Sequence, residues 1–497
     1  MENLKTKSLS SNYILYNLRK LLDVFVPLII FPYVTRILGP EKLGKVGFAE
    51  SIIGYFMIFS KLGIPSYGLR EIARVRDDVY ERSRVFWELS IVLFVTTIIA
   101  AFAYFYIVLT VPRFSTDLLL YLVIFPTLIF SNFDYEWIYT AIEDQVFITK
   151  RYILVRILQC VLIFTLIRSS ESFIIYAGIF VGLSSFSSLF NIFHLRKYIS
   201  FINTKQLNIK RHIRYIFIIF ASVLGIQINR VLDVTMIGIM VDESSVSFYN
   251  VANRIVMLAR DLILGIVVIL NPRIENFFKK GDYEAYKRYL SVSLYAVLLL
   301  AIPATVGIIL LSSEMVDVIA GAEYTSSILS MQLLSPIIII VGLANIVVCL
   351  VLYPNRRESR YTITVFVSAF TNIIFNFFMI PRLGHNGAIL GTVLSEFITL
   401  TISTIMALPY LKKSLLTFSL KEFAKYLAST GLVVVIVLLI KHFMTNAIYV
   451  LVCSILITVP VYFITLIILK SICVMDLKQI VLSKFLNPKK RNVQHIE

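Results

Sequence analysis

Residues 213–241 read IRYIFIIFASVLGIQINRVLDVTMIGIMV, an apolar run that nevertheless carries Arg230 and Asp233. About 20 apolar residues are enough for a helix to cross a bilayer, and this run exceeds that length. Similar runs follow one another along the chain of 497 residues, of which 58% are hydrophobic and only 15% charged, with a mean hydropathy of +0.84. The sequence therefore predicts an all-α polytopic membrane protein without a large soluble domain.

Apolar runs of membrane-spanning length predict fourteen transmembrane helices. Their boundaries are Tyr13–Leu38, Val46–Ile64, Val85–Val111, Leu118–Thr140, Tyr152–Ile167, Ser172–Leu195, Ile213–Val241, Phe248–Leu270, Tyr289–Leu311, Ile328–Leu352, Tyr361–Ile380, Ala388–Tyr410, Phe423–Ile440 and Ala447–Leu469. We group them into two six-helix lobes, residues 1–200 and 201–415, followed by a final helix pair in residues 416–472 and a tail in residues 473–497.

A weak internal repeat supports this grouping. Sliding the chain by 210 residues places Pro126 of FPTLIF on Pro336 of SPIIII, each ahead of a basic loop. Two six-helix halves that begin on the same side of the membrane would be parallel repeats, and a site between such repeats is expected near mid-membrane. The last two predicted helices stand outside the repeat.

The distribution of lysine and arginine predicts the orientation. These residues gather in alternate loops, such as residues 70–84, 196–214 and 273–288, and are sparse in the intervening loops. Basic loops stay on the cytoplasmic side, so we expect both termini in the cytoplasm of a bacterial cell. The net charge of +17 follows from this spread over many loops, and it does not indicate a nucleic-acid partner.

Motifs for catalysis and nucleotide binding are weak. Residues 39–46, GPEKLGKV, resemble the start of a phosphate-binding loop, but Val46 replaces the required serine or threonine and no strand precedes it. The cysteines and histidines are scattered without metal-ligand spacing. We therefore expect no enzyme activity, no catalytic residue, no metal site and no resident cofactor.

Charged residues inside the predicted membrane helices are the main functional signal, because a charge in the bilayer is costly and marks a pathway or site by default. Structural explanations compete with this one. Arg19 and Asp23, four residues apart, and Arg230 and Asp233, three apart, could simply pair on one helix face. Arg19, Lys20 and Lys61 lie near enough to a helix end to extend their charged groups to the lipid head groups.

Basic groups outnumber acidic ones in the first, seventh and eighth predicted helices, so we expect a hydrated site for an anion. Arginine suits a diphosphate because its planar head donates paired hydrogen bonds to phosphate oxygens. Asn250, Arg254 and Asp261 also fall on one polar helix stripe. The predicted substrate-binding residues are Arg19, Lys20, Arg230, Arg254, Arg260 and Asn250, and the predicted coupling or gating residues are Asp23, Glu50, Asp233, Asp261 and Glu396.

Five stretches, in order, resemble Wzx-type polysaccharide flippases of the MOP exporter superfamily. They read PYVTRILGPEKLGKVGFAESIIGYF, KLGIPSYGLREIAR, NFDYEWIYTAIEDQVFITKRYI, INRVLDVTMIGIMVDESSVSFYNVANRIV and NIIFNFFMIPRLGHNGAILGTVLSEF. The resemblance covers residues 10–410. The chain departs from the family pattern at Ala141 and Ser247, where the family usually has glycine.

The resemblance implies a bundle of two six-helix lobes that moves an undecaprenyl-diphosphate-linked oligosaccharide from the inner to the outer leaflet by alternating access, for O-antigen, capsule or exopolysaccharide synthesis. It implies membrane lipids as partners, together with a polysaccharide polymerase and a chain-length regulator. The family often has the same or a similar residue at the positions of Asn17, Arg36, Asp233, Arg254 and Glu396.

Three alternatives remain at this point. A multidrug exporter of the same superfamily is expected to have more acidic than basic site residues, since its substrates are cations. A lipid II flippase would differ in the head group that it moves, and a membrane glycan polymerase would need a large outer loop. We expect transport to draw on an ion gradient or the membrane potential, with Glu396 or Asp233 coupling H⁺ or Na⁺.

Overall fold

The computed structural model describes residues 9–414 and 419–475, and the ordered elements in these ranges are helices. In the first half they are α1 (Leu9–Lys61), α2 (Ile64–Arg74), α3 (Val79–Thr110), α4 (Pro112–Ser115), α5 (Leu118–Ile124), α6 (Pro126–Asn132), α7 (Glu136–Ala141), α8 (Gln145–Leu166), η1 (Ser170–Ser172), α9 (Phe173–Leu195), η2 (Thr204–Gln206) and α10 (Lys210–Met240). The second half contains α11 (Glu243–Lys280), α12 (Tyr283–Ile319), η3 (Ala322–Tyr324), α13 (Ser327–Leu334), α14 (Ile337–Asn345), η4 (Ile346–Leu352), α15 (Glu358–Leu383), α16 (His385–Ser414), α17 (Leu420–Phe443) and α18 (Ala447–Ile468).

Helices dominate because a lipid-exposed backbone must satisfy its hydrogen bonds internally. Many large apolar side chains lie exposed on the helix surfaces, as a lipid-facing surface requires; Phe102, Leu262 and Phe443 are examples. The predicted all-α membrane fold is therefore confirmed for the described residues.

The predicted count of fourteen membrane crossings is not confirmed. Eleven described helices are long and apolar enough to span a bilayer, rather than fourteen. Residues 21–74 count as one span although they include most of the first predicted helix and all of the second. The helix α8 is not among the eleven, and α10 contributes only the shorter apolar segment Val231–Met240. Some side chains of α10, among them that of Arg230, lie outside the described part of the chain, and α8 carries the charges of Lys150, Arg151 and Arg156, so the count of fourteen stays a prediction.

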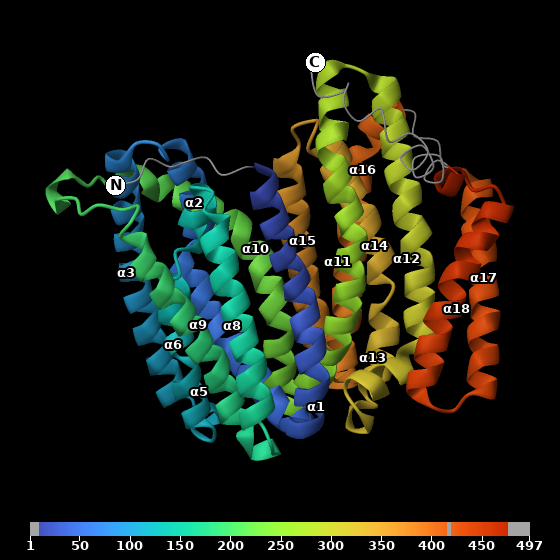
Figure 1. Cartoon of the computed structure of the whole chain (residues 1–497), viewed down its shortest axis with the longest axis horizontal. Helices are drawn as coiled ribbons and strands as arrows, with labels where there is room; N and C mark the ends of the chain where they lie inside the picture. Colours follow the sequence, from blue (N-terminus) through green and yellow to red (C-terminus); the bar gives the residue numbers. More distant parts are fainter. Residues whose placement is uncertain (1–8, 415–418, 476–497) are drawn as a thin grey trace. The chain divides into compact units, whose positions relative to one another are not determined.

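Within α1, Gly39 separates two helical segments. Its backbone has φ 70° and ψ 172°, a conformation that glycine adopts without strain. Pro40 follows and lacks the N–H that a continuous helix would need. Figure 1 shows the chain reversing its direction inside α1, so the segments before and after Gly39 are two separate crossings joined by a tight turn.

The chain divides into two compact units. The first comprises Met1–Asn250, Ile319–Glu323 and Ile373–Ala388, and the second Val251–Val318, Tyr324–Asn372 and Ile389–Glu497. This division places α10 with the first unit, whereas the lobes predicted from the sequence divide at residue 200; those lobe boundaries and the final helix pair as a separate segment stay predictions. From residue 476 onward, the predicted tail lies outside the described residues.

In the first unit, α1 is the central element and contacts α3, α6, α8 and α10, while α8 packs along α9 (Figure 1). A core of buried aromatic and aliphatic side chains holds α2, α3 and α7 together around Tyr67, Leu89, Trp137 and Tyr139. The α1 segment after the turn approaches the start of α11 so closely that a Cβ on Gly44 would lie 1.7 Å from the carbonyl oxygen of Glu243. Glycine is therefore required at this contact.

In the second unit, α17 and α18 form an antiparallel hairpin (Figure 1). Each of these helices begins with a side-chain cap: Ser419 accepts a hydrogen bond from the backbone N–H of Glu422, and Asn446 accepts from Ile448 and Tyr449. Such caps satisfy N–H groups that the first helical turn leaves unpaired. Another feature of this unit is the π-helix η4, which directly continues α14.

Candidate functional site

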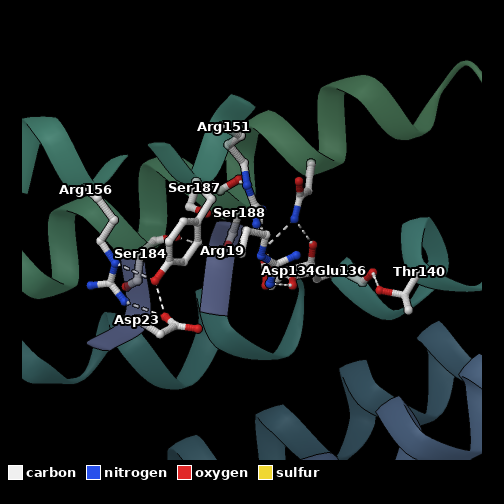
Figure 2. Close-up of polar contacts among 12 residues, drawn as sticks. Arg19, Asp23, Asp134, Glu136, Thr140, Arg151, Arg156, Ser184, Ser187 and Ser188 are labelled. Carbon is white, nitrogen blue, oxygen red and sulfur yellow. Dashed lines mark hydrogen bonds and ion pairs between the residues drawn. The ribbon is translucent and has the colours of Figure 1, made fainter. Parts of the chain in front are cut away.

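The first unit contains a network of charged side chains from α1, α7, α8 and the α6–α7 connection. Figure 2 shows its members pointing toward one another. Three guanidinium groups, of Arg19, Arg151 and Arg156, face three carboxylates, of Asp23, Asp134 and Glu136. The formal charges of these six groups balance, and the anion site predicted from the excess of basic residues in the first, seventh and eighth helices stays a prediction.

Glu136 lies at the centre of the network because it binds two arginines at once. Its Oε1 accepts from Arg19 at 2.5 Å, and its Oε2 accepts from Arg151 at 2.7 Å. The other Nη of Arg151 donates to Asp134 at 3.1 Å. Charge-assisted hydrogen bonds of this kind are stronger than neutral ones, and they join α1, α7 and α8 directly.

The α6–α7 connection explains how two carboxylates reach the same arginine. Tyr135, between them, has φ 52°, in the left-handed region, so the chain turns sharply between Asp134 and Glu136. Asn191 on α9 fixes this turn by donating to the backbone oxygen of Asp134 at 2.5 Å and to its carboxylate at 2.6 Å. Glu136 also occupies the first turn of α7, where the helix dipole favours a negative charge.

A second branch of the network joins α1 to α8 through Asp23. Arg156 donates to Asp23 at 3.3 Å and to the hydroxyl of Tyr152 at 2.7 Å, and that hydroxyl donates to Asp23 in turn. The guanidinium groups of Arg19 and Arg156 lie 5.3 and 4.8 Å from the centre of the Tyr152 ring, within cation–π range. Arg19 and Asp23 thus each bind a residue on another helix, rather than pairing along α1.

Asp233 lies in a separate buried site of the first unit. Its side chain is 2% exposed and accepts hydrogen bonds from the Tyr249 hydroxyl at 2.8 Å and from the Asn376 amide at 2.6 Å. These partners come from α11 and α15, so the carboxylate connects three helices. The predicted Arg230–Asp233 pair is not tested, since the side chain of Arg230 lies outside the described part of the chain.

Besides Arg254, the second unit holds three of the predicted residues, and these lie in two places. Arg260 forms an ion pair with its neighbour Asp261, whose side chain is 63% exposed, at 2.7 Å. Glu396 lines a cavity of about 170 Å³ formed by α14, η4, α15 and α16.

The structure describes four more of the predicted residues. Arg36, Glu50 and Arg254 are exposed, and Asn250 lies against Gly47, where a Cβ would come within 2.8 Å of its amide nitrogen. The side chains of Asn17 and Lys20 are outside the described part of the chain. The substrate-binding and coupling roles of all these residues stay predictions.

Sequence reasoning missed several members of the network, although a signal was present. Asp134 and Glu136 fall inside the fourth predicted helix and Arg156 inside the fifth, so they are charges in the membrane like those that were selected. Arg151 directly precedes the fifth predicted helix, which begins at Tyr152, yet the structure places it in α8 with only 5% of its side chain exposed.

Two family models match more than half of the chain each. One, described as "Polysaccharide biosynthesis protein", matches residues 9–278, and the other, "Lipid II flippase MurJ", matches residues 153–461. The chain is 22% identical over 382 residues to the "Putative O-antigen transporter" of Escherichia coli (strain K12), covering 75% of this chain and 90% of that protein. It is 26% identical over 180 residues to the "Probable low-salt glycan biosynthesis flippase Agl15" of Haloferax volcanii, covering 36% of this chain and 37% of that protein.

Solved structures show the same fold. "Lipid II flippase MurJ, inward closed conformation" aligns with a TM-score of 0.75 and 18% identity, covering 93% of this chain and 99% of that chain. An inward-facing multidrug resistance MATE family transporter of the MOP superfamily aligns with a TM-score of 0.58 and 16% identity, covering 79% and 96%. At these identities the structural likeness establishes the fold alone. The sequence relatives are named as transporters and flippases, which confirms the prediction that the chain is not an enzyme.

Proposed function

From the premise that this chain belongs to the polysaccharide biosynthesis protein family, as a Wzx-type flippase of the MOP superfamily, we propose which cargo it moves and how. The cargo is an oligosaccharide repeat unit carried on undecaprenyl diphosphate, which crosses from the inner to the outer leaflet of the bacterial cytoplasmic membrane by alternating access. The product feeds O-antigen, capsule or exopolysaccharide synthesis. The observation that carries the proposal is the family match over residues 9–278, a range that includes the whole charge network of the first unit.

The balanced network suggests how an anionic head group would be received. A diphosphate offers oxygens that can accept paired hydrogen bonds from arginine. In this structure Glu136 accepts a single hydrogen bond from Arg19, and Asp23 accepts a single one from Arg156. In the proposed mechanism, the diphosphate displaces Glu136 from Arg19, or Asp23 from Arg156, and accepts the hydrogen bonds of that arginine instead. The carboxylates keep the arginines neutralised and oriented before the cargo arrives, which lowers the cost of holding guanidinium groups at membrane depth.

The polyprenyl tail can remain in lipid, so only the glycan and the diphosphate need a polar path. Because the sequence shows no nucleotide-binding motif, we propose that an H⁺ or Na⁺ gradient, or the membrane potential, supplies the energy, with Asp233 or Glu396 as the coupling group. The potential contributes about 2.3 kcal/mol per charge per 100 mV, and an inside-negative potential favours outward movement of an anion. Both termini would be cytoplasmic, and a polymerase and a chain-length regulator would act on the translocated units.

A lipid II flippase is the second candidate, since the MurJ model matches residues 153–461. Among the sequence relatives, the lipid II flippase of Bacillus subtilis (strain 168) aligns with 31% of this chain, whereas the Escherichia coli O-antigen transporter aligns with 75%. Both cargoes carry a diphosphate, so the same arginines would serve either one. The glycan that accumulates when the protein is lost distinguishes the two functions.

Deletion of the gene is expected to abolish the surface polysaccharide and to trap lipid-linked repeat units in the inner leaflet. Wild type should restore the surface polysaccharide and remove the trapped lipid-linked units. Arg19→Ala, Arg230→Ala and Arg254→Ala should restore less than about a tenth of the surface glycan, because each removes a predicted diphosphate ligand. The measurement is surface glycan by antibody or lectin binding, together with mass spectrometry of the lipid-linked pool. Arg168→Ala is the matched control, since Arg168 is exposed and donates to the backbone oxygen of Thr165, three residues earlier.

Two results would contradict the proposal. Accumulation of lipid II with normal surface polysaccharide would favour the second candidate. A normal lipid-linked pool with increased drug sensitivity would indicate a multidrug exporter.

A further inference from the structure

The second unit contains a polar cavity that the predicted anion site does not use. Its volume is about 170 Å³, and residues of α14, η4, α15 and α16 line it. Polar lining groups include the Glu396 carboxylate, the Tyr361 hydroxyl, the Thr399 hydroxyl and the Asn345 amide. A polar cavity of this size has room for several water molecules.

Two of these groups already have partners. Thr399 donates to the backbone oxygen of Ser395 at 3.1 Å, and the Asn345 amide nitrogen donates to the backbone oxygen of Val341 at 3.1 Å. The remaining oxygen of Asn345 accepts from the thiol of Cys349 at 3.7 Å.

Glu396 and Tyr361 differ from these groups. In residues 9–414 and 419–475, neither the carboxylate of Glu396 nor the hydroxyl of Tyr361 has a hydrogen-bond or ion-pair partner, and both residues line the cavity. Glu396 is also the only lining residue with a formal charge. An unpaired carboxylate at membrane depth is costly, so the site requires something to neutralise it.

The backbone beside the cavity is unusual in a way that fits a functional site. In η4 the hydrogen bonds span five residues, as shown by Tyr353 N–H donating to the oxygen of Val348 at 3.0 Å. π-helices are rare and frequently occur at functional sites, because the wide turn displaces side chains from an α-helical register. Here the wide turn carries two cavity-lining residues, Val348 and Cys349.

We propose that Glu396 is the proton-binding group of this hydrated cavity. The charged or titratable groups that face it are Arg260 on α11, Cys349 in η4, Tyr353 directly after η4 and Tyr361 on α15. Arg260 interacts electrostatically with Glu396, but its guanidinium is bound to Asp261 at 2.7 Å.

A sodium ion fits the cavity less well than a proton. A sodium ion needs several oxygen ligands at once, whereas the lining offers a single carboxylate and otherwise neutral oxygens, such as those of Thr399 and Asn345, which also take part in hydrogen bonds within their own helices. The positive charge of Arg260 opposes the binding of either cation, so the number of ligands decides between them. A proton needs only the carboxylate, with Tyr361 or water as its hydrogen-bond partner.

Proton release would change the partner of Arg260. When Glu396 carries the proton it is neutral, and Arg260 binds Asp261 as it does in this structure. When the proton leaves, the Glu396 carboxylate attracts the same guanidinium and competes with Asp261. A role of Glu396 in driving transport rests on the proposed function. The binding of a proton by Glu396 does not depend on which cargo is moved.

The test is infrared difference spectroscopy of the purified full-length protein in liposomes, recorded during a pH titration without substrate. We expect a carboxylic-acid C=O band at neutral pH that disappears on alkalinisation and is absent in Glu396→Gln. Glu284→Gln, which alters an exposed carboxylate at the start of α12, is the matched control and should retain the band. Tyr361→Phe should shift the band, since it removes a polar hydroxyl from the cavity that holds the acid.

Other results would overturn the proposal. A band that persists in Glu396→Gln would assign the proton to another group. Loss of the wild-type band when NaCl replaces choline chloride at constant pH would identify a sodium site. Should Glu396→Gln fail to fold, an unshifted band in Tyr361→Phe would also count against the site. Because transport is not measured, these outcomes are independent of whether the cargo is a lipid-linked glycan.

Discussion

Gly44→Ala is expected to lower the free energy of unfolding by about 3 kcal/mol, at the upper end of what overpacking usually costs. The added Cβ would lie 1.7 Å from the carbonyl oxygen of Glu243 and 2.5 Å from its carbonyl carbon. Both are backbone atoms at the first residue of α11, so no side-chain rotation can relieve the clash. The α1 segment and the start of α11 would have to separate.

Thermal unfolding of the purified protein in detergent, followed by tryptophan fluorescence, measures this effect. Gly182→Ala is the matched control, because Gly182 also lies within a helix of the first unit but has nothing within 4 Å of its Cβ position. The control should unfold at the wild-type temperature or slightly above it, since alanine favours a helix over glycine by about 0.5–1 kcal/mol. Equal melting of the two variants would show that α1 and α11 do not approach this closely.

Arg151→Met is expected to have a comparably large effect, about 3 kcal/mol or more. The Arg151 side chain is only 5% exposed. Its removal breaks the ion pair with Asp134, whose atoms lie 3.1 Å apart, and leaves Glu136 paired with Arg19 alone. Removing one member of a buried ion pair is strongly destabilising because the remaining charge loses its compensation. Methionine keeps much of the apolar volume, so the loss of charge dominates.

The yield of folded protein and its melting temperature measure this second effect. Arg168→Met is the control, since Arg168 is exposed beyond the end of α8. Adding Asp134→Asn to Arg151→Met should recover part of the loss, because the uncompensated carboxylate is then removed as well. If the double variant is no more stable than Arg151→Met, the network does not act through charge compensation.

The sequence was sufficient to predict the helical membrane architecture, since long apolar runs constrain the backbone to helices. It was less informative about the site. Arg19 and Asp23 were recognised as charges in the membrane, but their partners lie more than 110 residues away along the chain, on α7 and α8. Spacing within one helix cannot indicate such pairs. The left-handed Tyr135 that turns Glu136 toward Arg151 has no sequence signature either, since glycine or asparagine is the usual residue in that conformation.

The phosphate-loop resemblance in residues 39–46 illustrates the same limit. Its glycines are explained by packing and chain geometry: Gly39 makes the turn inside α1, and Gly44 permits the contact with Glu243. A glycine-rich pattern reports that the backbone needs freedom or space, and only the structure shows which neighbour imposes the requirement.

The charges of α8 have a consequence for how the chain enters the membrane during synthesis. An arginine at the centre of an inserting helix costs about 2.5–3.5 kcal/mol, and α8 carries Arg151 and Arg156 in one segment. Their acidic partners Asp23, Asp134 and Glu136 all precede α8 in the chain, so these residues have already been synthesised when α8 leaves the ribosome. We expect α8 to integrate efficiently only with α1 and α6–α7 present, which glycosylation mapping of nascent chains with and without those helices would reveal.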